Sequence, residues 1–223
     1  GTIPSKALKE AVLDLKATQR SMAALTTAPP CIDRRTQLSV LTGSCQRVIK
    51  AEIDVVRRHF SNNGIDIVHG VGTFASPDTI VVETNTGVET IGAEFICIAT
   101  GTSPAKPAGI PFDTTRIFTS DEILGLQSLP QTMIVVGGGV IGSEYASMMA
   151  ALGVRVTLIE GRNRLMEFLD QEICEALHYH LRQMGATLRL GEKVVSIMLG
   201  EGSQNRPPSV SPSDAPVGGG GAV

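Results

Sequence analysis

Apolar residues recur at helical spacing in two segments near the start of the chain. Ser5 can cap a helix over about residues 6–24, because its side chain can accept a hydrogen bond from the first turn. The apolar stripe of this helix consists of Ala7, Leu8, Ala11, Val12 and Leu15. A second helix is predicted over about residues 45–61, with its apolar stripe at Ile49, Ile53, Val56 and Phe60. Residues 26–30 interrupt the helical pattern, and residues 62–64 end it.

After residue 64 the pattern changes to short β-rich runs separated by turn residues. Strands are predicted at residues 65–68, 79–83 and 88–91, with a turn at residues 85–87 between the last two. A fourth apolar run, over residues 95–101, reads as a strand that ends at Gly101. Residues 103–111 are rich in proline and suggest a domain boundary.

The second half of the chain alternates strand and helix. Residues 132–160 read as a β-α-β unit, followed by a helix over about residues 171–184 and a strand after Gly185. The sequence therefore predicts an α/β protein. A doubly wound, Rossmann-type domain over residues 116–199 should follow a first domain with a β-meander over residues 1–115. Residues 200–223 are rich in Ser, Pro and Gly and are predicted to be a disordered tail.

The β-α-β unit carries a glycine motif with a known chemical use. Gly137 permits a tight turn, Gly139 lets the main chain approach a pyrophosphate, and Gly142 lets the next helix pack closely. Glu160 ends the second strand 23 positions after Gly137, where a carboxylate can bind a ribose hydroxyl. The predicted dinucleotide-binding residues are Gly137, Gly138, Gly139, Val140, Ile141, Gly142 and Glu160. The alternative is a glycine-rich turn between core elements.

Composition and charge argue against some classes of binding partner. A net charge of −3 argues against nucleic acid as a main partner, and no apolar run is long enough to span a bilayer. The four cysteines show no CxxC pair, and Cys97 and Cys174 read as small buried hydrophobes. The cysteines favour a reduced cytoplasmic protein, with a Cys31–Cys45 disulfide as the alternative. His178 and His180 point to different helix faces and read as solvated residues, so no metal site is predicted.

The segment over residues 1–6, the Ala-Thr-Gly at residues 99–101 and the GGGxIGxE run at residues 137–144 resemble the pyridine-nucleotide-disulfide oxidoreductase family of flavoproteins. The resemblance covers residues 1–199, and it implies that residues 1–115 are a partial FAD-binding domain and residues 116–199 an NAD(P)-binding domain. It implies that Lys6 lies beside a flavin with Glu144 as its ion-pair partner; a first-turn surface lysine and an exposed helix acid are the alternatives. It also implies that Gly72, Ala99, Thr100 and Gly101 contact FAD. Gly72 reads equally well as an ordinary strand-end turn.

The nicotinamide specificity stays open. Glu160 favours NAD over NADP, because a carboxylate repels a 2′-phosphate, while Arg162 and Arg164 follow closely and offer the cation that NADP requires. Solvated loop arginines are the alternative for both.

Thr2 stands where most of the family has a redox-active cysteine. A threonine hydroxyl has no disulfide chemistry. One branch of the family shares this departure, the FAD-dependent, Si-specific transhydrogenases, which pass hydride between NADPH and NAD⁺. The alternatives are a piece of a lipoamide dehydrogenase-like disulfide reductase and a non-catalytic dinucleotide-binding module. The family's first FAD motif and its dimerisation domain are not found in the sequence, so we expect a fragment of a homo-oligomeric cytoplasmic enzyme.

Overall fold

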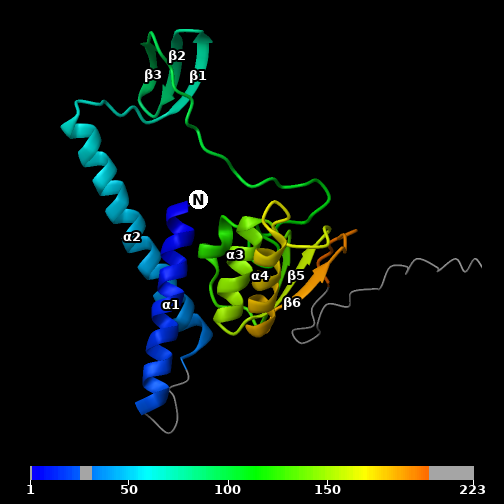
Figure 1. Cartoon of the computed structure of the whole chain (residues 1–223). Coiled ribbons are helices and arrows are strands. Elements are labelled where there is room, and N and C mark those ends of the chain that lie inside the picture. The colour runs from blue at the N-terminus through cyan, green and yellow to red at the C-terminus, as the bar shows by residue number, and fades with distance from the viewer. Residues whose placement is uncertain (1, 26–31, 201–223) are drawn as a thin grey trace, which may run out of the picture.

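The computed structural model describes residues 2–25 and 32–200, with the main chain alone at Thr2. Two long helices, α1 (Thr2–Leu25) and α2 (Arg34–Asn62), precede an antiparallel meander. A parallel unit follows: β4 (Thr132–Val136), α3 (Val140–Ala151), β5 (Arg155–Glu160), α4 (Gln171–Gln183) and β6 (Thr187–Leu190). Figure 1 shows the meander set apart from the parallel sheet, at the far end of α2. The predicted tail at residues 201–223, and Cys31 with its possible disulfide, lie outside the described residues.

Helix α1 buries the stripe that its sequence predicts. Ala7, Leu8, Val12 and Leu15 are all at most 9% exposed. They form one cluster with Leu41 and Cys45 of α2 and Met148 of α3. The helix pair therefore packs against the first helix of the parallel unit, across the domain boundary that the sequence suggests. In the described ranges, no helix is long and apolar enough to cross a membrane.

Helix α2 begins eleven residues before the predicted start. Asp33 caps it, and its side chain accepts hydrogen bonds from the main-chain N–H groups of Arg35 and Thr36. The buried residues of this helix are Leu38, Leu41 and Cys45. The predicted stripe is wrong in its C-terminal half, where Ile53 and Val56 are each 45% exposed, because this half extends away from the helices that would cover it (Figure 1).

The meander consists of β1 (Val71–Ser76), β2 (Thr79–Thr84) and β3 (Gly87–Gly92), paired antiparallel in that order. The predicted meander and its last two strands are confirmed. The strand predicted at residues 65–68 is wrong: these residues form the connection from α2 to β1. The strand predicted at residues 95–101 is also wrong. That run is irregular, Phe95 is 85% exposed, and Cys97 is exposed rather than buried.

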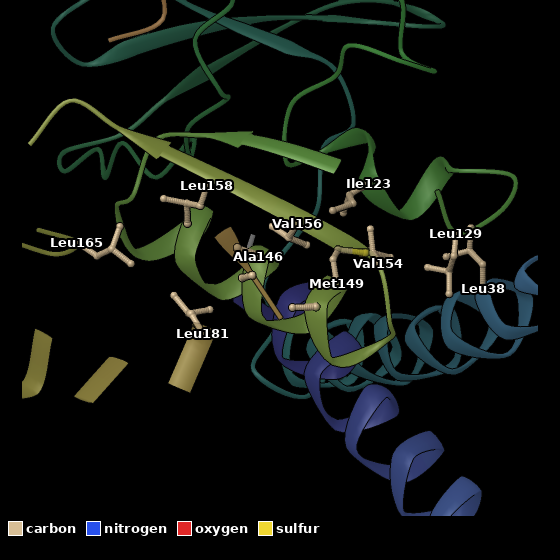
Figure 2. Packing of buried hydrophobic residues seen from close by; sticks show 12 residues of the cluster. Leu38, Ile123, Leu129, Ala146, Met149, Val154, Val156, Leu158, Leu165 and Leu181 are labelled. Atoms are coloured by element: carbon tan, nitrogen blue, oxygen red, sulfur yellow. The ribbon is translucent and has the colours of Figure 1, made fainter. Parts of the chain in front are cut away.

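Strands β4, β5 and β6 form a parallel sheet in that order, as the sequence predicts for a Rossmann-type unit. Helices α3 and α4 lie against the same face of this sheet (Figure 1). Figure 2 shows the core between them, in which Val156 and Leu158 of β5 meet Ala146 and Met149 of α3 and Leu181 of α4. All five are at most 2% exposed. The predicted α/β class is confirmed.

An ion pair holds the connection between the meander and the parallel unit. Lys106 Nζ donates to Glu122 Oε1 at 2.6 Å, and the hydroxyl and main-chain N–H of Thr119 donate to Glu122 Oε2 at 2.6 and 2.7 Å. The bond from Lys106, followed by those from Thr119, lowers the pKa of Glu122 from 4.5 to about 2.

This lowered pKa predicts an acid dependence of stability. Because the folded pKa lies below the unfolded value, the Glu122 carboxylate stabilises the fold above about pH 4.5 and loses that effect as pH falls toward about 2. The difference in unfolding free energy between the wild type and Glu122→Gln should therefore shrink over this range, as followed by urea unfolding at several pH values. Asp121→Asn is the control, because among the described residues the Asp121 side chain makes no cap hydrogen bond. A difference that does not change with pH would contradict the account.

Candidate dinucleotide-binding site

The candidate site lies where two neighbouring parallel strands end. The ladder between β4 and β5 pairs Val136 with Ile159, and one further bond from Gly137 N to Ile159 O (2.9 Å) carries it into the glycine turn. Since parallel strands end at the same edge of a sheet, Glu160 arrives directly beside this turn. Gly138 N donates to Glu160 Oε2 at 2.6 Å.

Each glycine of the turn has its own reason to lack a side chain. Gly137 has φ of +106°, a conformation that residues with a Cβ rarely adopt. A Cβ on Gly142 would lie 1.9 Å from Gly137 O, so only glycine lets α3 pack so closely on the turn. Gly139 differs, because no described atom lies within 4 Å of a Cβ placed there. The turn is therefore packed on its inner side and open at Gly139.

The open side faces the beginning of α3. Gly139 caps this helix, and Val140 and Ile141 are 55% and 58% exposed. The first N–H groups of a helix have no acceptor within it, and they carry the positive end of the helix dipole. Together with the space beside Gly139, these N–H groups form a main-chain surface that fits the pyrophosphate of a dinucleotide.

Glu160 is held as a carboxylate at the edge of this surface. Partial burial raises its pKa, but the hydrogen bonds from the N–H groups of Gly138 and Arg162 and the positive charge of Arg162 outweigh burial, so the net pKa shift is downward. The Arg162 N–H donates to Glu160 Oε1 at 2.9 Å. With one bond on each oxygen, the carboxylate keeps lone pairs for ribose hydroxyls.

The two predicted arginines lie in the loop between β5 and α4. Arg162 Nε lies 3.8 Å from Glu167 Oε2, and Arg164 donates to the main-chain oxygen of Glu167 at 3.3 Å. Arg162 is exposed. The loop therefore places a cation, Arg162, next to Glu160. The residue that favours NAD and the residue that would favour NADP thus lie side by side.

Three residues that the sequence did not indicate complete the surroundings of Gly138. Leu165 is fully buried, and its Cδ2 atom lies 2.3 Å from a Cβ built on Gly138. The Met166 N–H donates to Gly138 O at 3.2 Å. His178 Nε2 accepts from Leu165 N at 3.1 Å, and this histidine is 3% exposed, so its reading as a solvated residue is wrong. His180 is exposed as expected. These contacts are tertiary, and the local sequence carries no signal for them.

Lys6 and Glu144 meet across 138 positions of sequence. Lys6 Nζ lies 2.7 Å from Glu144 Oε1, joining α1 to α3. The lysine side chain is 59% exposed and the glutamate 18%. Lys6 also borders an open groove of about 500 Å³ between α1 and α2, whose lining includes Glu10, Asp14 and Glu52. Those three acids disfavour an anion in this groove.

The remaining FAD-contact candidates are not assembled with the glycine turn. Gly72 belongs to β1, where an added Cβ would lie 3.3 Å from Ile80 Cγ2 of β2, so packing within the meander also favours glycine there. Ala99, Thr100 and Gly101 are exposed in the irregular connection after the meander. Figure 1 shows this connection running from the meander toward the parallel unit. In the described residues, the glycine turn, the start of α3 and Glu160 lie together, and we call this group the cradle, whereas the FAD candidates are spread over several elements.

Comparison with known proteins places this geometry in a family. The model of a family described as pyridine nucleotide-disulphide oxidoreductase matches residues 1–206. The chain belongs to this family. Among curated relatives, a soluble pyridine nucleotide transhydrogenase of Mycobacterium bovis is 46% identical over 202 residues, which are 90% of this chain and 43% of the relative. One of Chromohalobacter salexigens is 41% identical, over 88% of this chain and 42% of the relative.

Solved structures agree on the fold. LpdA of Mycobacterium tuberculosis superposes with a TM-score of 0.75 at 23% identity, over 88% of this chain and 43% of LpdA. The HOCl-induced flavoprotein disulfide reductase RclA of Escherichia coli gives a TM-score of 0.64 at 28% identity, over 87% and 40% of the two chains. The chain thus spans less than half the length of the curated relatives and of these two solved chains.

Proposed function

We propose that this chain supplies the nicotinamide-dinucleotide site of an FAD-dependent NAD(P)⁺ transhydrogenase of the Si-specific type. The observation that carries the proposal is the glycine turn, which is packed at Gly142 and open at Gly139. The main-chain N–H of Gly138 in this turn donates a hydrogen bond to Glu160. The names of the relatives at 46% and 41% identity support the choice of reaction. We further propose that the complete enzyme is a homo-oligomer in the cytoplasm.

Each part of the cradle has a proposed task. The N–H groups at the start of α3 bind the pyrophosphate, and Glu160 binds the adenosine ribose. Arg162 offers the cation that a 2′-phosphate requires when the nucleotide is NADP. The bound nucleotides and FAD supply the hydride chemistry, while the protein orients them and adjusts their surroundings.

Lys6 and Glu144 have a proposed task toward FAD. A cation next to a flavin stabilises the negative charge of the reduced ring, and Glu144 holds the Lys6 ammonium group at 2.7 Å. Gly72, Ala99, Thr100 and Gly101 are proposed FAD contacts in the complete enzyme. In the chain itself these residues are dispersed, and the acids beside Lys6 repel an anion, so we propose that the chain alone binds NAD(H) but binds FAD weakly.

The reaction is tested in a protein that carries this chain together with the remaining segments of its relatives. We expect NADPH to reduce thio-NAD⁺, as followed by the absorbance of the reduced analogue, in an enzyme that contains FAD. Failure of an FAD-loaded enzyme to transfer hydride between the two nucleotides would refute the transhydrogenase proposal.

Glu160 gives a prediction for the chain alone. Glu160→Ala should weaken NADH binding by about 1–3 kcal/mol, the scale for a lost hydrogen bond to a charged group. NADPH binding should weaken less, or strengthen, because a negative charge near the 2′-phosphate is removed. Calorimetric titration of both nucleotides measures this. Glu172→Ala is the control, since that exposed acid lies beyond the loop, in the first turn of α4. Equal losses for both nucleotides would place Glu160 away from the ribose.

A further inference from the structure

His178 is a buried polar side chain outside the predicted site, on the helix that follows it. Its Nε2 atom accepts a hydrogen bond from the main-chain N–H of Leu165. An imidazole nitrogen accepts only when it carries no proton, so the neutral ring has its proton on Nδ1. Nδ1 lies 3.7 Å from Glu175 Oε2. The hydrogen bond from Leu165 therefore orients the ring, with its acceptor directed at the loop between β5 and α4.

Two contacts connect that loop to the glycine turn, and both are made to Gly138 by adjacent loop residues. The Leu165 side chain fills the space next to Gly138, and the adjacent Met166 N–H donates to Gly138 O. Met166 has φ of +45°, which a residue with a side chain adopts only when its surroundings hold it there. The hydrogen bond from the Leu165 N–H to His178 is one of the contacts that hold the main chain there.

Gly138 receives restraints on both of its polar groups. Its carbonyl accepts from Met166 of the loop, and its N–H donates to Glu160. The loop follows directly after Glu160, the last residue of β5, and carries Arg162. A displacement of the loop at Leu165 would therefore move Glu160 and Arg162, which are proposed to face the ribose, and the glycine turn, which is proposed to face the pyrophosphate.

We propose that His178 is a positioning residue for the dinucleotide site. It touches no proposed ligand group; it holds the main chain at Leu165 and Met166, which in turn holds Gly138 beside Glu160. The part that concerns nucleotide affinity rests on the proposed function of the cradle. The restraint on the loop is a property of the chain without any ligand.

The test separates the acceptor from the bulk of the side chain. His178→Phe keeps a ring but has no acceptor, whereas His178→Gln keeps an acceptor near the position of Nε2. His180→Phe is the matched control, because His180 is exposed on the same helix two positions along. All variants are made in the whole 223-residue chain.

Two quantities are measured: hydrogen exchange of the Leu165 and Met166 amides without nucleotide, and the Kd for NADH. For His178→Phe we expect faster exchange at both amides, unchanged exchange in β5, and a Kd raised about tenfold, the scale for one lost buried hydrogen bond. His178→Gln should stay within about threefold of the wild type, and His180→Phe should match it. If His178→Phe does not fold, His178→Asn, whose shorter amide does not reach Leu165 N, takes its place.

The outcomes are distinguishable. A wild-type chain that does not bind NADH refutes the proposed function, while amide exchange still tests the loop restraint. A wild type that binds NADH, with His178→Phe binding equally well or exchanging equally slowly at Leu165, overturns the positioning role. Equal losses in the Phe and Gln variants would also overturn it, since ring bulk rather than the acceptor would then matter.

Discussion

Replacing Gly139 with Ala should weaken NADH binding at least about a hundredfold while leaving the chain folded. The main chain at Gly139 is extended, with φ of −73° and ψ of −173°, which alanine adopts without strain. No described atom lies within 4 Å of the added methyl, so the fold has room for it. The methyl would occupy the space through which a pyrophosphate approaches the main chain. Calorimetric titration and thermal unfolding measure the two effects.

Gly142→Ala is the matched variant, and it should lose stability as well as binding. Its Cβ would meet Gly137 O at 1.9 Å, so α3 must move away from the turn. We expect a loss of stability of about 1–3 kcal/mol, the range for overpacking a core, together with lost binding. A Gly139→Ala chain that binds NADH like the wild type would show that the pyrophosphate lies elsewhere.

The second large effect concerns Thr2 in the complete enzyme. A flavin without a neighbouring dithiol passes electrons only to a partner that contacts it directly, as nicotinamides do. Disulfide substrates require a thiolate to exchange with. The enzyme should therefore transfer hydride from NADPH to thio-NAD⁺ and show negligible reduction of lipoamide or glutathione disulfide.

Thr2→Cys alone should not create disulfide reductase activity, because a single thiol lacks the partner that completes a disulfide cycle. Coupled assays with lipoamide and with glutathione disulfide check this, and the transhydrogenase assay of the same preparation is the control. Rapid lipoamide turnover by the wild-type enzyme would refute the transhydrogenase proposal and favour a disulfide reductase.

The parts of the fold that the sequence predicts are those with a local signal. The β4-α3-β5 unit combines apolar strands, glycines and an acid within 29 residues, and its three elements lie within the predicted residues 132–160. The start of α2 was missed although Asp33 is a good N-cap, because the following residues Arg34–Gln37 contain no apolar side chain to mark the helix. Leu38, Leu41 and Cys45 then lie on the face that becomes buried.

Other errors arise where tertiary context decides. The apolar run at residues 95–101 has the composition of a buried strand, but a strand requires a partner, and the described strands do not pair with it. His178 and His180 differ only in which face of α4 they occupy, and nothing local shows that Leu165 folds back onto the first of them. The contacts that hold Gly138 are in this sense invisible to sequence reasoning.

The proposed dinucleotide site is best tested by titrating the purified 223-residue chain with NADH and, separately, with FAD. We expect saturable binding of one NADH per chain, lost in Gly139→Ala, and weak or undetectable binding of FAD. Tight stoichiometric binding of FAD without any binding of NADH would contradict it.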